Sequence, residues 1–109
     1  MNVWHGIGNL TKDPDIKYKP GNDPLCICRM TVAINDGYGD KKTTYFIPVV
    51  CFGSVAENCE RFLSKGSKVA IEGKIKTGSY EKDGQKIYTT DIHADKVEFL
   101  SGSQDNRLP

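Results

Sequence analysis

Residues 25–35 read LCICRMTVAIN, and every second position from Cys26 to Ile34 carries an apolar side chain. The apolar set consists of Cys26, Cys28, Met30, Val32 and Ile34, and the alternate positions include Arg29, Thr31 and Asn35. Successive side chains of a β-strand point to opposite faces, so this period of two is typical of a strand with one buried face. The segment therefore predicts a half-buried β-strand.

Four further segments show the same alternation and predict strands, namely residues 3–10, 45–52, 69–75 and 86–94. In the second of these, one face carries Tyr45, Ile47, Val49 and Cys51, and the other carries Phe46, Pro48, Val50 and Phe52. Asp83 and Gly84 lie between the last two segments, where glycine supplies the positive φ of a tight hairpin. Five strands are expected in all.

One helix is predicted, over residues 54–65. Ser54 is a suitable N-cap, Glu57 completes a capping box three residues later, and Gly66 ends the helix. The helix falls between the third and fourth predicted strands. The expected order is thus three strands, a helix and two strands.

This order predicts an all-β fold with one helix, specifically an OB-fold, a five-stranded Greek-key barrel with a helix between strands three and four. An SH3-like barrel and a split β-sandwich share the pattern and remain alternatives. We expect one domain over residues 1–100. Residues 101–109 are polar and aperiodic, which indicates a short disordered tail.

The composition limits the class of protein. A chain of 109 residues is long enough to bury one core. It is too short for a catalytic domain together with a cofactor domain. Its longest apolar run, residues 45–52, is far shorter than the roughly 20 residues that span a bilayer. The N-terminus lacks the features of a signal peptide. We expect a cytoplasmic protein without membrane contact.

Cysteine and histidine spacing favours neither a metal nor catalysis. The four cysteines are expected to be reduced and buried, and no second cluster accompanies Cys26 and Cys28 to complete a zinc site. His5 and His93 lack a neighbouring nucleophile, and the sequence contains no phosphate-binding glycine motif or paired carboxylates. We therefore expect a protein that is not an enzyme, with no catalytic residue, metal or cofactor.

Aromatic and basic residues alternate along the chain in a way that suits unpaired nucleic-acid bases. Residues 61–89 hold seven Lys or Arg and three acidic residues, although the whole chain has a formal net charge of only +1. A base stacked on an aromatic ring contributes about 1–3 kcal/mol, and lysines neutralise the phosphates. Two alternatives stay open: Phe46 and Phe52 could belong to the core, and Tyr88 could be a strand-edge residue.

Several motifs occur in the order and at the spacing found in a known family. They are residues 1–2 (MN), 7–14 (IGNLTKDP), 52–53 (FG), 56–58 (AEN), 63–67 (LSKGS), 69–73 (VAIEG) and 77–80 (TGSY). With these motifs the chain resembles the bacterial single-stranded DNA-binding proteins over about residues 1–100. The resemblance implies an OB-fold that assembles as a homo-oligomer, with a tetramer favoured over a dimer.

The resemblance also implies the function and its residues. The family binds single-stranded DNA with little sequence preference and protects it in replication, recombination and repair. A member of this family is expected to be associated with the nucleoid, or to lie in the host cytoplasm if it is phage-encoded. Its stacking aromatics correspond to Tyr38, Phe46, Phe52 and Tyr80. Its basic contacts correspond to Lys65 and Lys76, with Lys41, Lys42 and Lys74 as neighbours that could reach phosphate.

The chain departs from the family at some positions. Pro48, Ser54 and Gly78 stand where basic or polar residues are common, which implies a shallower salt dependence of binding. Trp4, His5 and Gly6 replace the family's usual apolar trio in the first strand, and Trp4 is expected at a subunit interface. The end of the sequence, NRLP, lacks the family's acidic tip, so recruitment of repair proteins by that route is not carried over.

Two other functions remain alternatives to DNA protection. One is a primosome-type accessory OB protein that bridges helicase or primase partners. The other is an RNA chaperone of the cold-shock type, which also has an OB-fold.

Overall fold

The computed structural model describes residues 1–22 and 24–100. Its strands are β1 (Trp4–Leu10), β2 (Asp15–Lys19), β3 (Leu25–Asp36), β4 (Thr43–Phe52), β5 (Lys68–Lys82) and β6 (Gln85–Phe99). A 3₁₀ turn, η1 (Gly39–Lys41), joins β3 to β4, and the helix α1 (Gly53–Phe62) joins β4 to β5. The tail predicted over residues 101–109 lies outside the described residues. Within the described ranges, no helix is long and apolar enough to cross a membrane.

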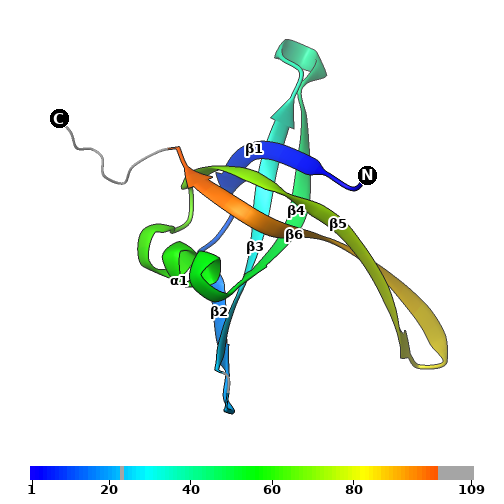
Figure 1. The fold of residues 1–109 in the computed structure, drawn as a ribbon. Coiled ribbons are helices and arrows are strands. Elements are labelled where there is room, and N and C mark those ends of the chain that lie inside the picture. Colours follow the sequence, from blue (N-terminus) through cyan, green and yellow to red (C-terminus); the bar gives the residue numbers. More distant parts are fainter. Residues whose placement is uncertain (23, 101–109) are drawn as a thin grey trace.

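The strands form one sheet that closes on itself (Figure 1). The strand order is β1-β5-β6-β4-β3-β2, and β1 also pairs with β3 through Asn9 and Leu10. All pairs are antiparallel except β4 with β6. The predicted all-β fold with one helix, of the OB type, is confirmed.

The core fills the inside of the closed sheet. The alternation of residues 25–35 has the expected result, because Cys26, Cys28, Met30 and Val32 are all at most 4% exposed. They pack with buried side chains of β1, β4, β5, β6 and α1. All four cysteines are buried and free of disulfides, which confirms the expectation of reduced thiols.

The structure adds a sixth strand to the five predicted. β2 pairs only with β3, and along β2 only Ile16 is partly buried. A strand of five residues with one half-buried side chain has too little alternation to be recognised in a sequence. Its backbone pairing with β3, rather than an apolar face, holds it in the sheet.

The helix begins and ends earlier than predicted, and the predicted capping box is wrong. Phe52 occupies the N-cap position and makes no side-chain capping bond, so Ser54 lies within the first turn. Gly53 adopts φ of 67°, which lets β4 turn directly into the helix. At the other end Phe62 is the last helical residue. The next residue, Leu63, is extended and buried, so the chain leaves the helix three residues before it reaches Gly66.

Close backbone approach explains Gly8, as its place in a strand pattern suggests. A Cβ at Gly8 would overlap the carbonyl oxygen of Ala33 on β3. This is the point where β1 leaves β5 and begins to pair with β3. The glycine therefore permits the closure of the sheet.

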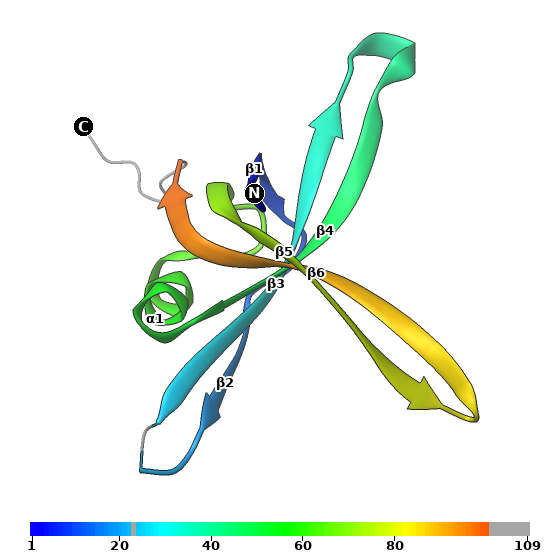
Figure 2. The same ribbon diagram turned by 45° about the vertical axis from the view of Figure 1, so that its right-hand side comes forward.

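Two hairpins extend beyond the closed part of the sheet (Figure 2). The β3–β4 hairpin carries η1 at its tip, and the β5–β6 hairpin is tighter, with Asp83 and Gly84 at positive φ as predicted for the glycine. Beyond the core, positions that would face inward are open to solvent, and Tyr45 is 51% exposed. The two hairpins thus carry exposed side chains beyond the closed part of the sheet.

Candidate nucleic-acid interface

A row of four side chains crosses the outer wall of the sheet on β3, β4, β6 and β5. Val50 is paired with Arg29 on β3 and with His93 on β6, and His93 is paired with Lys74 on β5. Residues paired directly across a ladder point to the same face, so all four belong to one surface. We call this set, Arg29, Val50, His93 and Lys74, the outer row. Val50 is 3% exposed yet lies outside the core cluster, so it is the floor of this surface.

Two phenylalanines of β4 flank the outer row. Phe46 and Phe52 lie an even number of residues from Val50 and therefore share its face. The Phe52 ring centroid lies 5.5 Å from that of His93, with the planes tilted by 45°. Phe46 is 64% exposed and Phe52 40% exposed. The alternative that placed these rings in the core is wrong.

The β5–β6 hairpin continues the same face with a lysine and a tyrosine. Lys76 and Tyr80 follow Lys74 at even spacing on β5, and Tyr80 is exposed. Tyr80 is paired with Ile87, whereas Tyr88 is paired with Ser79. Tyr80 and Tyr88 therefore point to opposite faces of the hairpin.

The electrostatic environment of His93 shows that this surface is positive. Partial burial lowers the pKa of His93, and the nearby charges of Lys76, Lys74 and Arg29 lower it further. The carboxylate of Asp91 acts in the opposite direction but does not reverse the shift. The positive charge beside His93 comes from Lys76, Lys74 and Arg29, and such a charge attracts an anion such as a phosphate.

The other predicted site residues lie at different distances from the outer row. Tyr38, Lys41 and Lys42 are exposed at the tip of the β3–β4 hairpin, on or beside η1. Lys65 lies between α1 and β5, where its backbone N–H donates to a carboxylate oxygen of Asp13 at 2.8 Å. The structure thus groups Phe46, Phe52, Lys74, Lys76 and Tyr80 along one face, places three residues at a hairpin tip, and holds Lys65 beside the β1–β2 connection.

Two residues of this surface were missed in the sequence. Arg29 occupies a solvent-facing position in the alternation of residues 25–35, and His93 is one of two isolated histidines. The alternation does predict that Arg29 faces outward. It cannot predict that Arg29 and His93 face each other across Val50, because that depends on the parallel register of β4 and β6.

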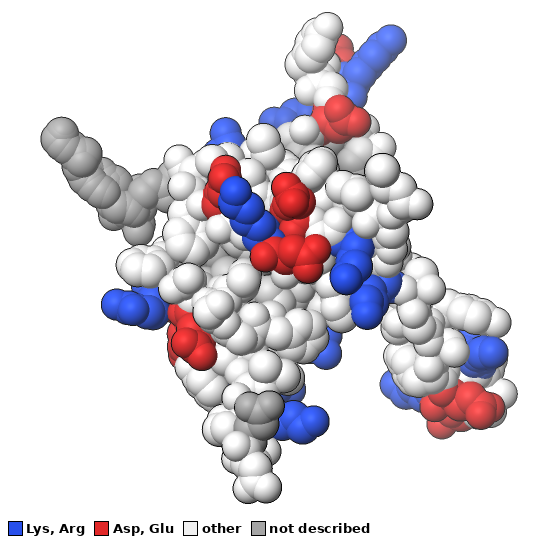
Figure 3. Space-filling view, viewed as in Figure 1, with Lys and Arg blue, Asp and Glu red and all other residues white. Residues whose placement is uncertain are grey.

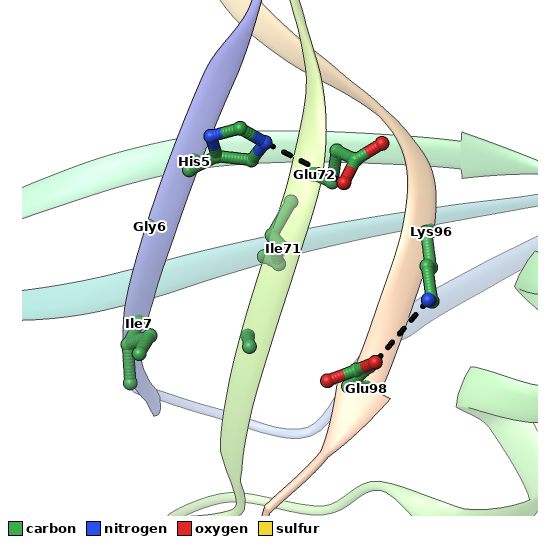
Figure 4. Close-up of a pocket in the computed structure, with 8 residues that line it drawn as sticks. His5, Gly6, Ile7, Ile71, Glu72, Lys96 and Glu98 are labelled. Carbon is green, nitrogen blue, oxygen red and sulfur yellow. Dashed lines mark ion pairs between the residues drawn. The ribbon is translucent and has the colours of Figure 1, made fainter.

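A hollow lined by other residues lies over β1, β5 and β6, and its charges differ from those of the outer row (Figure 4). His5 Nε2 lies 3.4 Å from a carboxylate oxygen of Glu72, and Lys96 Nζ lies 3.2 Å from one of Glu98. The space-filling view in Figure 3 shows acidic side chains near the middle of the face and basic side chains mainly toward its edges and the hairpins. Glu72 and Glu98 place two carboxylates in this hollow, which makes it a poor site for a phosphate.

The closed sheet, the helix that follows β4 and the aromatic and basic outer wall define an OB-fold domain. The single-strand binding protein family matches residues 1–100, and the chain belongs to this family.

Its relatives carry consistent names. Single-stranded DNA-binding protein 2 of Clostridium acetobutylicum is 37% identical over 99% of this chain and 83% of its own length. The single-stranded DNA-binding protein of Clostridium tetani is 41% identical over 95% of this chain and 78% of its own length. Single-stranded DNA-binding protein 3 of Listeria innocua is 36% identical over 96% of this chain and 67% of its own length.

Proposed function

We propose that the protein binds single-stranded DNA with little sequence preference, without catalysing a reaction, and protects it during replication, recombination and repair. Bases stack on Phe46, Phe52 and Tyr80, with Tyr38 reaching the strand from the hairpin tip. Lys74 and Lys76 neutralise phosphates beside the outer row, together with Arg29. Lys41, Lys42 and Lys65 contact the strand farther along its path.

The observation that carries this proposal is the outer row and its flanking rings. A single strand needs exposed aromatic planes for its bases and fixed cations for its backbone, and both lie on one face of four adjacent strands. Every base has a π-face, so stacking here gives little sequence preference. A duplex hides those faces, which makes the same surface selective for unpaired DNA.

The spacing of the rings supports an extended strand rather than a single bound nucleotide. Phe46 and Phe52 are six positions apart on β4, about 20 Å at the usual rise per residue. That separation is too large for the two rings to sandwich one base. They therefore stack on different bases of a strand that runs along β4 past the outer row.

We propose further that the protein is a homo-oligomer, with a tetramer favoured over a dimer. Ile7 on β1 is 55% exposed, and an exposed apolar residue on an outer strand suits a contact between subunits. Trp4 packs within its own chain against the core and over Gly6, so it supports β1 from inside. Sedimentation equilibrium, with and without oligo-dT, measures the mass directly, and a monomer under both conditions contradicts the proposal.

The test of function is fluorescence anisotropy with a labelled oligo-dT, a duplex of equal length and an RNA of equal length, each at two salt concentrations. We expect strong preference for single-stranded DNA and a modest loss of affinity at higher salt. Equal weak binding to DNA single strand and duplex contradicts the stacking surface. Equal affinity for RNA and DNA single strands favours the RNA-chaperone alternative instead.

A further inference from the structure

Three cysteine side chains that are far apart in the sequence meet inside the closed sheet. Cys28 lies on β3, Cys51 on β4 and Cys59 on α1, and their Sγ atoms all lie within 4.8 Å of one another. The Sγ atoms of Cys51 and Cys59 are 3.9 Å apart. All three side chains are 0% exposed. We call them the thiol triad.

The triad has the dimensions of a three-sulfur coordination site. A central atom with bonds of about 2.3 Å to three sulfurs, a usual bond length from thiolate sulfur to a metal, requires sulfurs no farther apart than about 3.9 Å, which is the separation of Cys51 Sγ and Cys59 Sγ. Sulfur pairs at up to 4.8 Å need only small side-chain rotations to reach that arrangement. Because the three cysteines come from separate elements, the folded chain itself positions the donors.

The net charge of the complex in the apolar core decides which ion or atom the triad can bind. Three thiolates around a monovalent or divalent ion leave a net negative charge, and burying an uncompensated charge is costly. Around a trivalent centre the complex is neutral. Zinc prefers four ligands, and the triad supplies three.

We propose that Cys28, Cys51 and Cys59 bind one trivalent arsenic atom in trigonal-pyramidal three-sulfur coordination, in which the side chains rotate toward one another and the arsenic, with its lone pair, lies out of the plane of the three sulfurs. Arsenous acid, As(OH)₃, exchanges its three hydroxyl groups for three thiolates. Three As–O bonds break, three As–S bonds form, and each thiol proton leaves with a hydroxyl as water, so three waters are released. No atom changes oxidation state, so no oxidant or reductant is needed.

Complete burial makes entry slow rather than impossible. Arsenous acid is small and uncharged at neutral pH, and it reaches the triad when α1 separates transiently from β3 and β4. Such local openings cost less than global unfolding. Cys51 is the neighbour of Phe52 on the proposed DNA-binding wall. Once bound, the arsenic links β3, β4 and α1 through its three sulfurs. Loading is therefore expected to stabilise the fold.

Native mass spectrometry of the intact protein tests the proposal, with arsenite as the probe and a phosphine reductant that offers no thiol. We expect one adduct whose mass equals one arsenic atom less three hydrogens. Coordination by two thiols would retain one hydroxyl, and the adduct would be heavier by one water. The adduct mass thus reports how many cysteines are bound.

Two matched variants identify the donors. Cys26→Ala removes a buried thiol of β3 outside the triad and is expected to keep the three-thiol adduct. Cys59→Ala is expected to lose it, and Cys51→Val serves as a second test if Cys59→Ala does not fold. Arsenite is expected to raise the melting temperature of the wild-type protein and of Cys26→Ala.

Several results would overturn the proposal. These are an adduct heavier by one water, loss of the adduct in Cys26→Ala, or uptake only when urea has unfolded the chain. A fourth is preferential binding of Zn²⁺ or Cu⁺ by a protein that takes up no arsenite. A lowered melting temperature would show that the unfolded chain binds arsenic more tightly than the native triad.

Discussion

Replacing Phe46 by alanine separates a stacking ring from a structural one. The side chain is 64% exposed, so roughly a third of the about 1.5–3 kcal/mol for full burial is at stake, which is about 0.5–1 kcal/mol of stability. A ring that stacks on a base contributes about 1–3 kcal/mol, so the affinity for oligo-dT is expected to fall roughly 5- to 150-fold. Binding should suffer more than folding.

The assay is an anisotropy titration of labelled oligo-dT at several salt concentrations, with thermal unfolding measured on the same samples. Since no charge is removed, the slope of log affinity against log salt should not change. Tyr88→Ala is the matched control, because Tyr88 is 74% exposed but points to the opposite face of the hairpin from Tyr80. If Phe46→Ala melts far below the wild type while its folded fraction binds normally, the stacking argument is refuted.

Further predictions concern charge, pH and packing. Lys76→Gln should reduce the magnitude of the salt slope by about 0.7, the value for one phosphate contact on a single strand, and an unchanged slope in anisotropy titrations would remove Lys76 from the interface. The lowered pKa of His93 means that the unfolded state takes up its proton first, so chemical denaturation should show stability falling below about pH 6.5, less so in His93→Gln. Phosphates bound beside His93 are expected to raise its pKa. The affinity for oligo-dT should therefore increase when the pH is lowered from about 7.5 to about 5.5, and an equal increase in His93→Gln would contradict the place of His93 in the DNA-binding surface. Gly73→Ala would push a Cβ against the carbonyl oxygen of His93 and should lower the free energy of unfolding by about 1–3 kcal/mol in urea titrations, whereas Gly78→Ala, whose Cβ would meet only the Thr89 hydroxyl oxygen at 3.2 Å, should lower it less.

Periodicity predicted the fold well where side chains alternate against the core. The strand of residues 25–35 and its buried set follow from the sequence, because burial of one face requires a period of two. β2 escaped prediction because backbone pairing holds it rather than an apolar face. The capping box at Ser54 was wrong because the helix already begins at Gly53, whose positive φ turns the chain out of β4, so that Phe52 and not Ser54 occupies the N-cap position.

The sequence predicted the residue types of the candidate site better than their arrangement. Alternation placed Phe46 and Phe52 on one face of their strand, and the structure shows that this face is exposed. The outer row required the register of β4 against β6, two strands that are about 40 residues apart in the sequence. The thiol triad was missed for the same reason, since its three cysteines share no local spacing.

Photochemical crosslinking of oligo-dT to the protein, with the crosslinked peptides identified by mass spectrometry, tests the central claim most directly. The claim is that single-stranded DNA crosses the outer row between the two phenylalanines of β4. Crosslinks at Phe46 or Phe52, lost when that ring is replaced by alanine, are the predicted result. Crosslinks confined to β1 and the end of β6, around His5 and Glu98, would place the DNA over the hollow on β1, β5 and β6 and contradict the account.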